Sequence, residues 1–352
     1  MAERVAVIPG DGVGPEVIKA GVRCLEAVSS LEFEWFDWGC ERYEKTGTMM
    51  PPDGLETLAR HRAIYLGAIG WPTVPDHISL WGLLLPIRKR FELYVNVRPV
   101  KLLQGVRGPL EGRGPSDIDM LFIRENTEGE YSGAGGHVHV GTDLELAVET
   151  SVFTKTAVER AVRYAFERAE ERRGSVISVT KSNASRYTYV LWDQVAARVA
   201  MDHPKVRLER VLVDAMAARM VANPGSVDVA VGSNLFADIL TDLAAAIQGG
   251  MGTAASANLD PSGKRPSMFE PVHGSAPDIA GRGVANPMGA ILSGALMLRH
   301  LKLQDAAAKL ESAVEAVTAS GVKTRDLGGS ATTTEFADEV IVRLKASTVP
   351  HR

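Results

Sequence analysis

The sequence predicts an α/β fold, because short apolar runs suited to buried strands alternate with segments of helical spacing. The expected strands cover residues 5–8, 64–68, 118–123, 176–180 and 227–231, and the expected helices cover 15–28, 153–171, 289–302 and 306–320. Size is a further observation: 352 residues, 45% of them hydrophobic, are enough for two domains with large cores.

The first expected strand ends in a glycine-rich turn within the stretch VAVIPGDGVGPE, residues 5–16. Pro15 opens the next expected helix, a position that proline tolerates. The spacing of Gly10, Gly12 and Gly14 is half of a dinucleotide-binding fingerprint, but its third glycine is missing. The turn alone is therefore weak evidence for a nucleotide site.

Composition excludes several classes of function. The formal net charge of −4 comes from well-mixed acidic and basic residues, unlike the basic surface of a nucleic-acid-binding protein. Cys24 and Cys40 stand far apart without a CxxC motif, which argues against a disulfide framework and against a zinc site. No stretch predicts a membrane span or a signal peptide, so we expect a cytoplasmic protein.

Two segments predict structural roles. The stretch GAGGHVHVGTDLEL, residues 133–146, combines glycine with period-two alternation, so we expect a hairpin-like arm that serves an interface. The helix expected at 289–302 is crowded with small residues, which permits close helix packing.

Three arginines lie at the edges of apolar segments, in LLLPIRKRFELYVNVRP and FIRENTEGEYSG. Arg88, Arg98 and Arg124 can each hold a carboxylate through the guanidinium fork. The alternative for each is an exposed or salt-bridged surface residue, because most arginines are exposed. Together the three favour a substrate with two carboxylates.

Two further side chains are candidates for proton transfer. Lys181 in VTKSNAS directly follows an apolar strand, where ligand-binding residues of open α/β sheets gather. Desolvation beside other cations can lower a lysine pKa enough for a base, whereas the alternative is a surface lysine. Tyr131 in GEYSG is either a proton donor or a tyrosine at the edge of the core.

Three aspartates predict a divalent metal site. Asp214 follows the alternating stretch 206–213, while Asp238 and Asp242 in NLFADILTD share one helix face. Carboxylates of this kind suit Mg²⁺ or Mn²⁺. Alternatively, Asp238 interacts favourably with a helix N-terminus through the macrodipole.

The stretch EPVHGSAPDIAGRGVANP, residues 270–287, is too rich in glycine, proline, serine and asparagine for regular structure, so we expect an ordered loop. Backbone amides around Gly274, Ser275 and Ala276 can hold an adenosine diphosphate. Asp278 can accept a hydrogen bond from a ribose hydroxyl and repel a 2′-phosphate, which favours NAD over NADP. The alternative is a long connecting loop.

Taken in order, the motifs PGDGVGPE, LLLPIRKR with NVRP, RENTEGEYSG, TKSN, VDAMAA, NLFADILTD and EPVHGSAPDIAG resemble those of the β-decarboxylating dehydrogenases. This family includes the isocitrate, 3-isopropylmalate, tartrate and D-malate dehydrogenases, and the resemblance covers essentially the full chain. It implies a two-domain, non-Rossmann fold. The large cofactor-binding domain would comprise 1–98 plus 253–352, and the small domain, which carries the arm, would comprise 99–252.

The resemblance also assigns roles to individual residues. It assigns substrate binding to Arg88, Arg98 and Arg124, catalysis to Tyr131 and Lys181, Mg²⁺ or Mn²⁺ to Asp214, Asp238 and Asp242, and NAD to His273, Gly274, Ser275, Ala276, Asp278, Asn286 and Asn183. K⁺ is a further candidate ion. Lys181 and Asp214 would serve the neighbouring subunit's site, which implies a homodimer interlocked through the arm.

The implied reaction is a metal-assisted oxidation followed by β-decarboxylation. Lys181 removes the proton of the C2 hydroxyl as hydride leaves for NAD. The β-carboxylate then leaves as carbon dioxide, and Tyr131 protonates the enol carbon, directly or in a relay with Lys181.

The substrate is predicted from PDHISLWGLLLPIRK, residues 75–89, of which DHISLWG resembles the tartrate and D-malate dehydrogenases. If this segment is helical, Trp81, Leu84 and Leu85 form an apolar wall beside Arg88. The wall offers no partner to a third carboxylate, which disfavours isocitrate and homoisocitrate. Leu83 replaces a serine common in that branch, which favours D-malate over tartrate.

Pro86 departs from the usual residue of this branch and is tolerable only in the first turn of a helix. Two alternatives to the D-malate assignment remain open. One is 3-isopropylmalate, whose isopropyl group Leu84 and Leu85 can contact. The other is a non-catalytic regulatory subunit or nucleotide-binding module, which a replaced Tyr131, Lys181 or aspartate would favour, although all are present.

Overall fold

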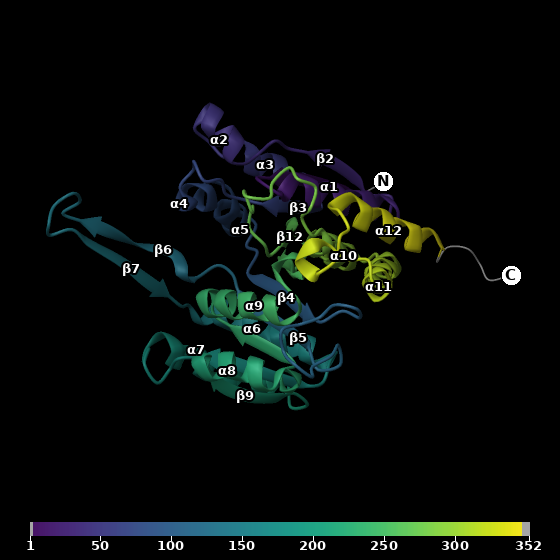
Figure 1. Cartoon of the computed structure of the whole chain (residues 1–352). Helices are drawn as coiled ribbons and strands as arrows, with labels where there is room; N and C mark the ends of the chain where they lie inside the picture. The colour runs from purple at the N-terminus through teal and green to yellow at the C-terminus, as the bar shows by residue number, and fades with distance from the viewer. Residues whose placement is uncertain (1–2, 347–352) are drawn as a thin grey trace. The chain divides into compact units, whose positions relative to one another are not determined.

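The computed structural model describes residues 3–346, and the chain divides into two compact units (Figure 1). The first comprises Met1–Leu93, Pro99–Ile118 and Ala245–Arg352, and the second comprises Tyr94–Arg98 and Asp119–Ala244. The predicted bounds differ from these units: the sequence assigned residues 99–118 and 245–252 to the small domain and residues 94–98 to the large domain.

A mostly parallel sheet forms the centre of the first unit. Its strands follow the order β2 (Glu32–Trp35), β1 (Arg4–Gly10), β3 (Ala63–Ala68), β12 (Ser267–Pro271) and β11 (Ala255–Leu259). β1 pairs in parallel with β2 and β3, and β12 pairs in parallel with β3 but antiparallel with β11. The strand β4 (Val95–Lys101) begins in the second unit and ends in the first.

Two groups of helices accompany this sheet. The N-terminal group contains α1 (Gly14–Glu26), α2 (Cys40–Thr46), α3 (Gly54–Leu58), α4 (Asp76–Ser79) and α5 (Leu85–Arg90). The C-terminal group contains α10 (Met288–His300), α11 (Gln304–Ala319) and α12 (Thr333–Ala346). Short 3₁₀ turns lie at Met251–Thr253 and Arg325–Leu327.

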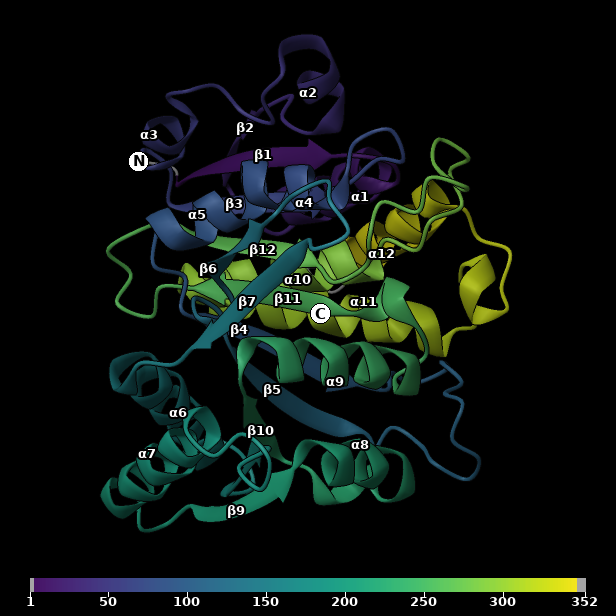
Figure 2. The ribbon, with the colours of Figure 1, turned by 90° about the vertical axis from the view of Figure 1, so that its left-hand side faces the viewer.

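The helix α10 is the centre of the helical packing in the first unit, where it contacts α1, α11, β11 and β12 (Figure 2). Ala290 and Ser293 of α10 are fully buried, and the Tyr65 hydroxyl donates a hydrogen bond of 2.6 Å to the Ala290 carbonyl. The expected close packing at 289–302 is therefore confirmed. Pro15 lies in the first turn of α1, as its position in the sequence predicted.

The second unit contains a fully parallel sheet. Its strands follow the order β5 (Asp119–Glu125), β10 (Val229–Gly232), β8 (Ser175–Thr180) and β9 (Arg207–Leu212). The helices of this unit are α6 (Lys155–Glu170), α7 (Thr188–Asp202), α8 (Val213–Ala222) and, for most of its length, α9 (Asn234–Ile247), and a 3₁₀ turn lies at Pro224–Ser226. In Figure 2, α6 and α7 lie together on one side of the strands and α8 on the other.

An antiparallel hairpin of β6 (Gly129–Val138) and β7 (Leu146–Val152) extends away from α6 and α9 of its own unit (Figure 1). It contains the arm expected at 133–146 and continues it by several residues on both sides. Its exposed apolar side chains are Val138, Val140, Leu144, Leu146 and Val148.

The expected strands and helices all coincide with elements of the structure, apart from small shifts at their ends. None of the helices within residues 3–346 is long and apolar enough to cross a membrane.

Candidate active site

The candidate residues of the second unit gather where its parallel strands end. Arg124 is the penultimate residue of β5, and Lys181 directly follows β8. Asp214 lies at the start of α8, immediately after β9, while α9 with Asp238 follows β10. Because carboxyl ends of parallel strands lie at one edge of the sheet, the topology brings these side chains to the same edge.

Arg98, Arg124 and Tyr131 converge on Asp238. Arg98 Nη2 lies 3.2 Å from Asp238 Oδ1, and Arg124 Nη1 donates a hydrogen bond to the same oxygen. The Tyr131 hydroxyl donates to Asp238 Oδ2 at 3.1 Å. Arg98 and Arg124 are only 7% and 2% exposed, so the interpretation of either as an exposed surface residue is wrong.

Uncharged side chains hold the two guanidinium groups in place. Arg98 donates from Nε to Asn96 Oδ1 at 2.8 Å and from Nη1 to Thr241 Oγ1 at 2.6 Å. Arg124 donates from Nε and Nη2 to Asn234 Oδ1, at 2.9 and 2.7 Å. Each arginine is thereby fixed in one orientation.

Sequence reasoning missed Asn96, Asn234 and Thr241. A signal for two of them exists, since Asn234, Asp238 and Thr241 are spaced i, i+4, i+7 and therefore share one face of α9. Asn96 also had a signal, because residues two apart in a strand share one face, and Asn96 lies two residues before Arg98 in β4.

Asp242 lies one turn beyond Asp238, with Oδ1 3.8 Å from Arg98 Nη1. Partial burial raises the pKa of Asp242, with a further increase from Asp238, against the lowering effects of Arg98 and Arg124. α9 carries no acidic residue in its first turn, so a macrodipole role for Asp238 is not supported.

Lys181 and Asp214 form a separate pair, with Lys181 Nζ 2.7 Å from Asp214 Oδ1. The Lys181 side chain is 29% exposed and that of Asp214 is 66% exposed. The hydrogen bond from Lys181 lowers the pKa of Asp214 below its ordinary value. Lys181 is therefore an oriented, partly buried group and not a freely solvated surface lysine.

The three aspartates predicted for the metal do not form one cluster. Within residues 3–346, no group of three or more histidine, cysteine, aspartate or glutamate side chains is arranged to hold a metal ion. The topology gives the reason: Asp214 follows β9 and Asp238 follows β10, and β8 lies between these strands, a separation of about 10 Å. Asp238 and Asp242 supply hard oxygen donors that fit a divalent ion, but only part of its coordination shell.

The third arginine of the predicted set, Arg88, lies in the first unit and is 5% exposed, so it is not a surface residue either. Its Nη2 donates to Glu270 Oε1 at 2.9 Å, and Asn258 Nδ2 donates to the same oxygen at 2.8 Å. Arg88 Nε is buried and has no hydrogen-bond partner among the described residues. Burying an N–H group without an acceptor costs free energy, which a ligand that accepts the hydrogen bond would recover.

The segment before Arg88 is helical, as predicted, but it contains a five-residue π-helical turn, Leu80–Leu84, between α4 and α5. The Leu85 amide bonds to the Leu80 carbonyl, five residues back. Pro86 lies in the first turn of α5, where its missing N–H is tolerated.

The π-helical turn departs from the α-helical spacing that the prediction assumed between Trp81 and Arg88. The apolar wall of Trp81, Leu84 and Leu85 beside Arg88 stays a prediction. The Lys89 ammonium lies 4.4 Å from the centre of the Trp81 ring. Trp81 is 42% exposed, whereas Leu85 is buried and Leu84 is partly buried against the core. The prediction assumed 3.6 residues per turn throughout.

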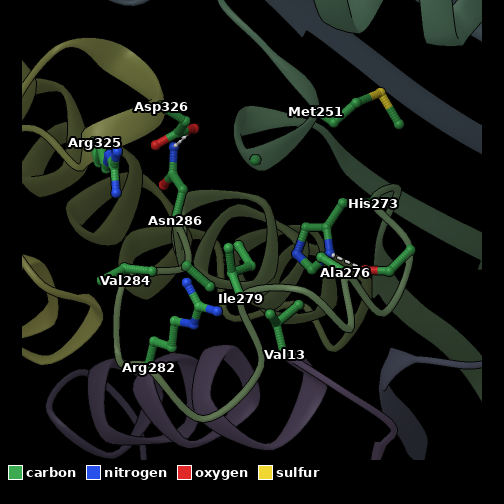
Figure 3. A pocket seen from close by; sticks show the side chains of 13 residues that line it. Val13, Met251, His273, Ala276, Ile279, Arg282, Val284, Asn286, Arg325 and Asp326 are labelled. Carbon is green, nitrogen blue, oxygen red and sulfur yellow. Dashed lines mark hydrogen bonds between the residues drawn. The ribbon is translucent and has the colours of Figure 1, made fainter. Parts of the chain in front are cut away.

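A cavity of about 800 Å³ lies beside the 272–287 loop of the first unit (Figure 3). The predicted cofactor residues His273, Gly274, Ala276 and Asn286 line it. Ser275 and Asp278 do not line it, and Asp278 is exposed. The volume lies within the range of about 300–1,000 Å³ that is typical of small-molecule sites.

The lining offers hydrogen-bonding groups on an apolar background. Burial lowers the pKa of His273, which favours the neutral imidazole, and its Nε2 is buried without a partner in the described part of the chain. Asn286 Nδ2 donates to Asp326 Oδ2 at 3.0 Å. Sequence reasoning missed Asp326 and also Arg282 and Arg325, which bring positive charge to the lining. The positive charge of Arg282 and Arg325 fits a phosphate-bearing ligand. Because His273 Nδ1 faces the Gly274 carbonyl, the neutral ring leaves Nε2 as an acceptor for a donor group of the ligand.

The glycine-rich turn near the N-terminus supports this loop. The Val13 amide donates to the Ser275 carbonyl at 2.8 Å, and Val13 itself lines the cavity. A Cβ at Gly12 would lie 2.0 Å from the Ser275 carbonyl oxygen, so only glycine fits. Ala276 has a φ of 41°, a strained conformation that the surrounding contacts hold.

The sequence of residues 4–340 matches the model of the isocitrate/isopropylmalate dehydrogenase family. The chain belongs to this family. The resemblance inferred from the motifs is confirmed, and so is the α/β fold of that family. Dehydrogenases of the isocitrate/isopropylmalate family generally use a divalent metal ion and a nicotinamide dinucleotide.

Relatives within the family cover almost the full chain. A probable tartrate dehydrogenase/decarboxylase of Agrobacterium vitis is 50% identical, over 98% of this chain and 99% of the relative. The decarboxylating D-malate dehydrogenase of Escherichia coli K12 is 49% identical, over 96% and 97%. The crystal structure of isocitrate dehydrogenase from Methylococcus capsulatus matches with a TM-score of 0.90 at 34% identity, over 97% of this chain and 99% of that one.

Proposed function

We propose that the protein catalyses the oxidative decarboxylation of D-malate to pyruvate and carbon dioxide, with tartrate as a further substrate. The observation that carries this proposal is the convergence of buried Arg98 and Arg124, together with Tyr131, on Asp238. Two fixed guanidinium groups suit a carboxylate-bearing substrate. The names of the tartrate and D-malate relatives support the choice of substrate.

The chain's own residues bind the substrate and move protons. Arg88, Arg98 and Arg124 hold the carboxylates, Lys181 accepts the proton of the C2 hydroxyl, and Tyr131 donates a proton to the carbon from which carbon dioxide leaves. When bound, the dinucleotide accepts the hydride and the divalent ion polarises the oxygen at C2. Loss of the β-carboxylate leaves its bonding electrons on the C2–C3 unit as an enolate, and the proton from Tyr131 at C3 converts it into the keto acid, which keeps its remaining carboxylate.

Asp238 and Asp242 are proposed ligands of Mg²⁺ or Mn²⁺, and Asp214 completes the set from the neighbouring subunit. Lys181 would act in that same neighbouring site, because it is paired with Asp214. The exposed apolar side chains of the β6–β7 hairpin support a homodimer in which the arms pack together.

NAD is the proposed dinucleotide, bound in the cavity lined by His273, Gly274, Ala276 and Asn286. Ser275, Asp278 and Asn183 remain proposed contacts. Asp278 would reject a 2′-phosphate by charge repulsion. K⁺ is a proposed additional ion. The buried free thiols of Cys24 and Cys40 support a reducing, cytoplasmic location.

Two readings of the substrate pocket compete with D-malate. Leu84 is partly buried and apolar, which supports contact with the isopropyl group of 3-isopropylmalate. Tartrate is the other; the names of the relatives favour it, whereas Leu83, fully buried in the core, offers no hydrogen bond to the second hydroxyl of tartrate, so we rank it below D-malate.

Reduction of NAD and of NADP by the purified protein tests the proposal, with Mn²⁺ or Mg²⁺ and a panel of D-malate, meso- and L-tartrate, 3-isopropylmalate and isocitrate. We expect the highest kcat/KM for D-malate with NAD, and a kcat lowered by about 10³-fold in Lys181→Met. A clear preference for 3-isopropylmalate would overturn the substrate assignment. No turnover of any substrate would favour the alternative of a non-catalytic regulatory subunit or nucleotide-binding module.

A further inference from the structure

Glu16, in the VGPE part of the N-terminal motif, contacts the wall of the dinucleotide cavity. It lies in the first turn of α1, and its Oε2 accepts a hydrogen bond of 2.9 Å from the Gly283 amide. Gly283 lies between Arg282 and Val284, both of which line the cavity. The carboxylate therefore bonds to the backbone of the wall itself.

The opposite side of the same residue is bonded to α12. The Thr333 amide donates to the Gly283 carbonyl at 2.9 Å, and Thr333 Oγ1 donates to the Ala285 carbonyl at 2.6 Å. Thr333 is 2% exposed and is the first residue of α12. The Gly283 N–H is thus bonded to the Glu16 side chain of α1, and its C=O to the first backbone amide of α12.

The segment needs such external bonds because its backbone is permissive. Gly283 has a φ of 64°, in the left-handed region that glycine enters without penalty. A glycine-rich segment with no regular structure has many accessible conformations, and each contact that selects one lowers the entropy that a ligand must remove on binding.

The electrostatics of Glu16 also support a role for its carboxylate in holding the loop. Burial raises the pKa of Glu16, against the lowering effects of the Gly283 and Ala285 amides. An apolar residue at this position of α1 would avoid the desolvation of a carboxyl group. A carboxylate accepts the hydrogen bond from the Gly283 amide, whereas an apolar side chain cannot.

We propose that Glu16 is a positioning residue for the dinucleotide: together with Thr333 it holds residues 281–285 in the conformation that forms the cavity wall. The inference rests on the proposed function in one respect, which is that the ligand of the cavity is a dinucleotide. It assigns to the N-terminal motif a role in shaping the cofactor site without contact with the cofactor.

The test compares Glu16→Ala and Glu16→Gln with the wild type, using NADH as the probe. Direct binding, followed by NADH fluorescence in the absence of substrate, should be about tenfold weaker in Glu16→Ala. Glu16→Gln should bind within about threefold of the wild type, because an amide oxygen also accepts from the Gly283 amide. KM for NAD should rise in Glu16→Ala, while KM for D-malate and kcat stay within about twofold.

Glu26→Gln, at the exposed C-terminal end of α1, is the matched control and should behave as the wild type. Hydrogen–deuterium exchange of the ligand-free proteins adds a readout that does not depend on the cofactor. Peptides covering 279–286 should exchange faster in Glu16→Ala than in the wild type.

The outcomes separate this inference from the proposed function. Equal NADH affinity and equal exchange in Glu16→Ala and wild type would overturn the role of Glu16 while leaving the dehydrogenase intact. A wild type that binds neither NADH nor NADPH would overturn the proposed function. In that case, faster exchange at 279–286 in Glu16→Ala would still support the loop-positioning role.

Discussion

The charged cluster of the second unit and the cavity of the first unit are organised by different forces. In the cluster, charged side chains hold one another: Arg98 and Arg124 pair with Asp238, and Lys181 pairs with Asp214. In the cavity, the backbone predominates: the Ser275 carbonyl bonds to Val13, and Gly283 bonds at both its N–H and C=O groups.

The two regions should therefore respond differently to the loss of one contact. Removing one member of a charged cluster leaves its partner uncompensated, and the effect is large and local. Removing one anchor of a loop releases a set of backbone conformations, and the effect is smaller and spread over the wall. Changes in the cluster should therefore affect the substrate and the chemical step, and changes around the cavity should affect the dinucleotide.

The largest expected effect is that of Lys181→Met. Loss of the proposed base should lower kcat for D-malate by about 10³-fold, within the usual range for general-base catalysis. The affinity for NADH should not change, because Lys181 belongs to the cluster. Steady-state kinetics and NADH fluorescence measure the two effects, and Lys205→Met, an exposed lysine of the same unit, is the control. An active Lys181→Met enzyme would contradict the assignment of the base.

A smaller effect is expected for Asn234→Ala, which removes the acceptor of two Arg124 hydrogen bonds. KM for D-malate should rise about tenfold, because Arg124 then loses its fixed orientation. NADH affinity should stay within about twofold of the wild type if the cluster and the cavity are independent. A change of NADH affinity as large as the change of KM would show that the cluster and the cavity are not independent.

For the cavity, Asp278→Lys should shift the ratio of kcat/KM values toward NADP by about tenfold, through attraction of the 2′-phosphate. Asp326→Asn is the informative partner variant, because Asp326 lines the cavity and Asp278 does not. If Asp326→Asn shifts the preference and Asp278→Lys leaves it unchanged, Asp326 replaces Asp278 as the acceptor of the ribose hydroxyl.

The smallest effect on function is expected for Tyr65→Phe. The variant loses the buried hydrogen bond to the Ala290 carbonyl, which should lower the free energy of unfolding by about 1 kcal/mol. Denaturant unfolding measures this loss, while NADH affinity and KM for D-malate should equal those of the wild type. If NADH affinity fell with stability, the proposed effect of Glu16→Ala would have to be attributed to general destabilisation.

Sequence patterns located the helices and strands well, for identifiable physical reasons. Buried parallel strands such as β8 and β10 are continuous apolar runs, and α1 carries one apolar face, so their periodicity is visible without neighbours. Lys181 and Asp214 became candidates because ligand-binding residues follow the ends of such strands.

Other features had no local signal. The π-helical turn at Leu80–Leu84 has no signal in the sequence, and only the hydrogen-bond pattern of the folded chain reveals it. Arg282, Arg325 and Asp326 lie in segments separated by some 40 residues and meet only at the cavity. Glu16 and Gly283 are 267 positions apart, and their bond follows from the packing of α1 against the loop.

The sequence by itself determined the family, the α/β architecture, the hairpin arm and most of the charged candidates, because these depend on residue order and short-range periodicity. The tertiary structure decided which of these charges compensate one another and which loop residues line the cavity. The reason is physical: ion pairs and cavity walls form between segments distant in the chain, and their geometry depends on how helices and strands pack.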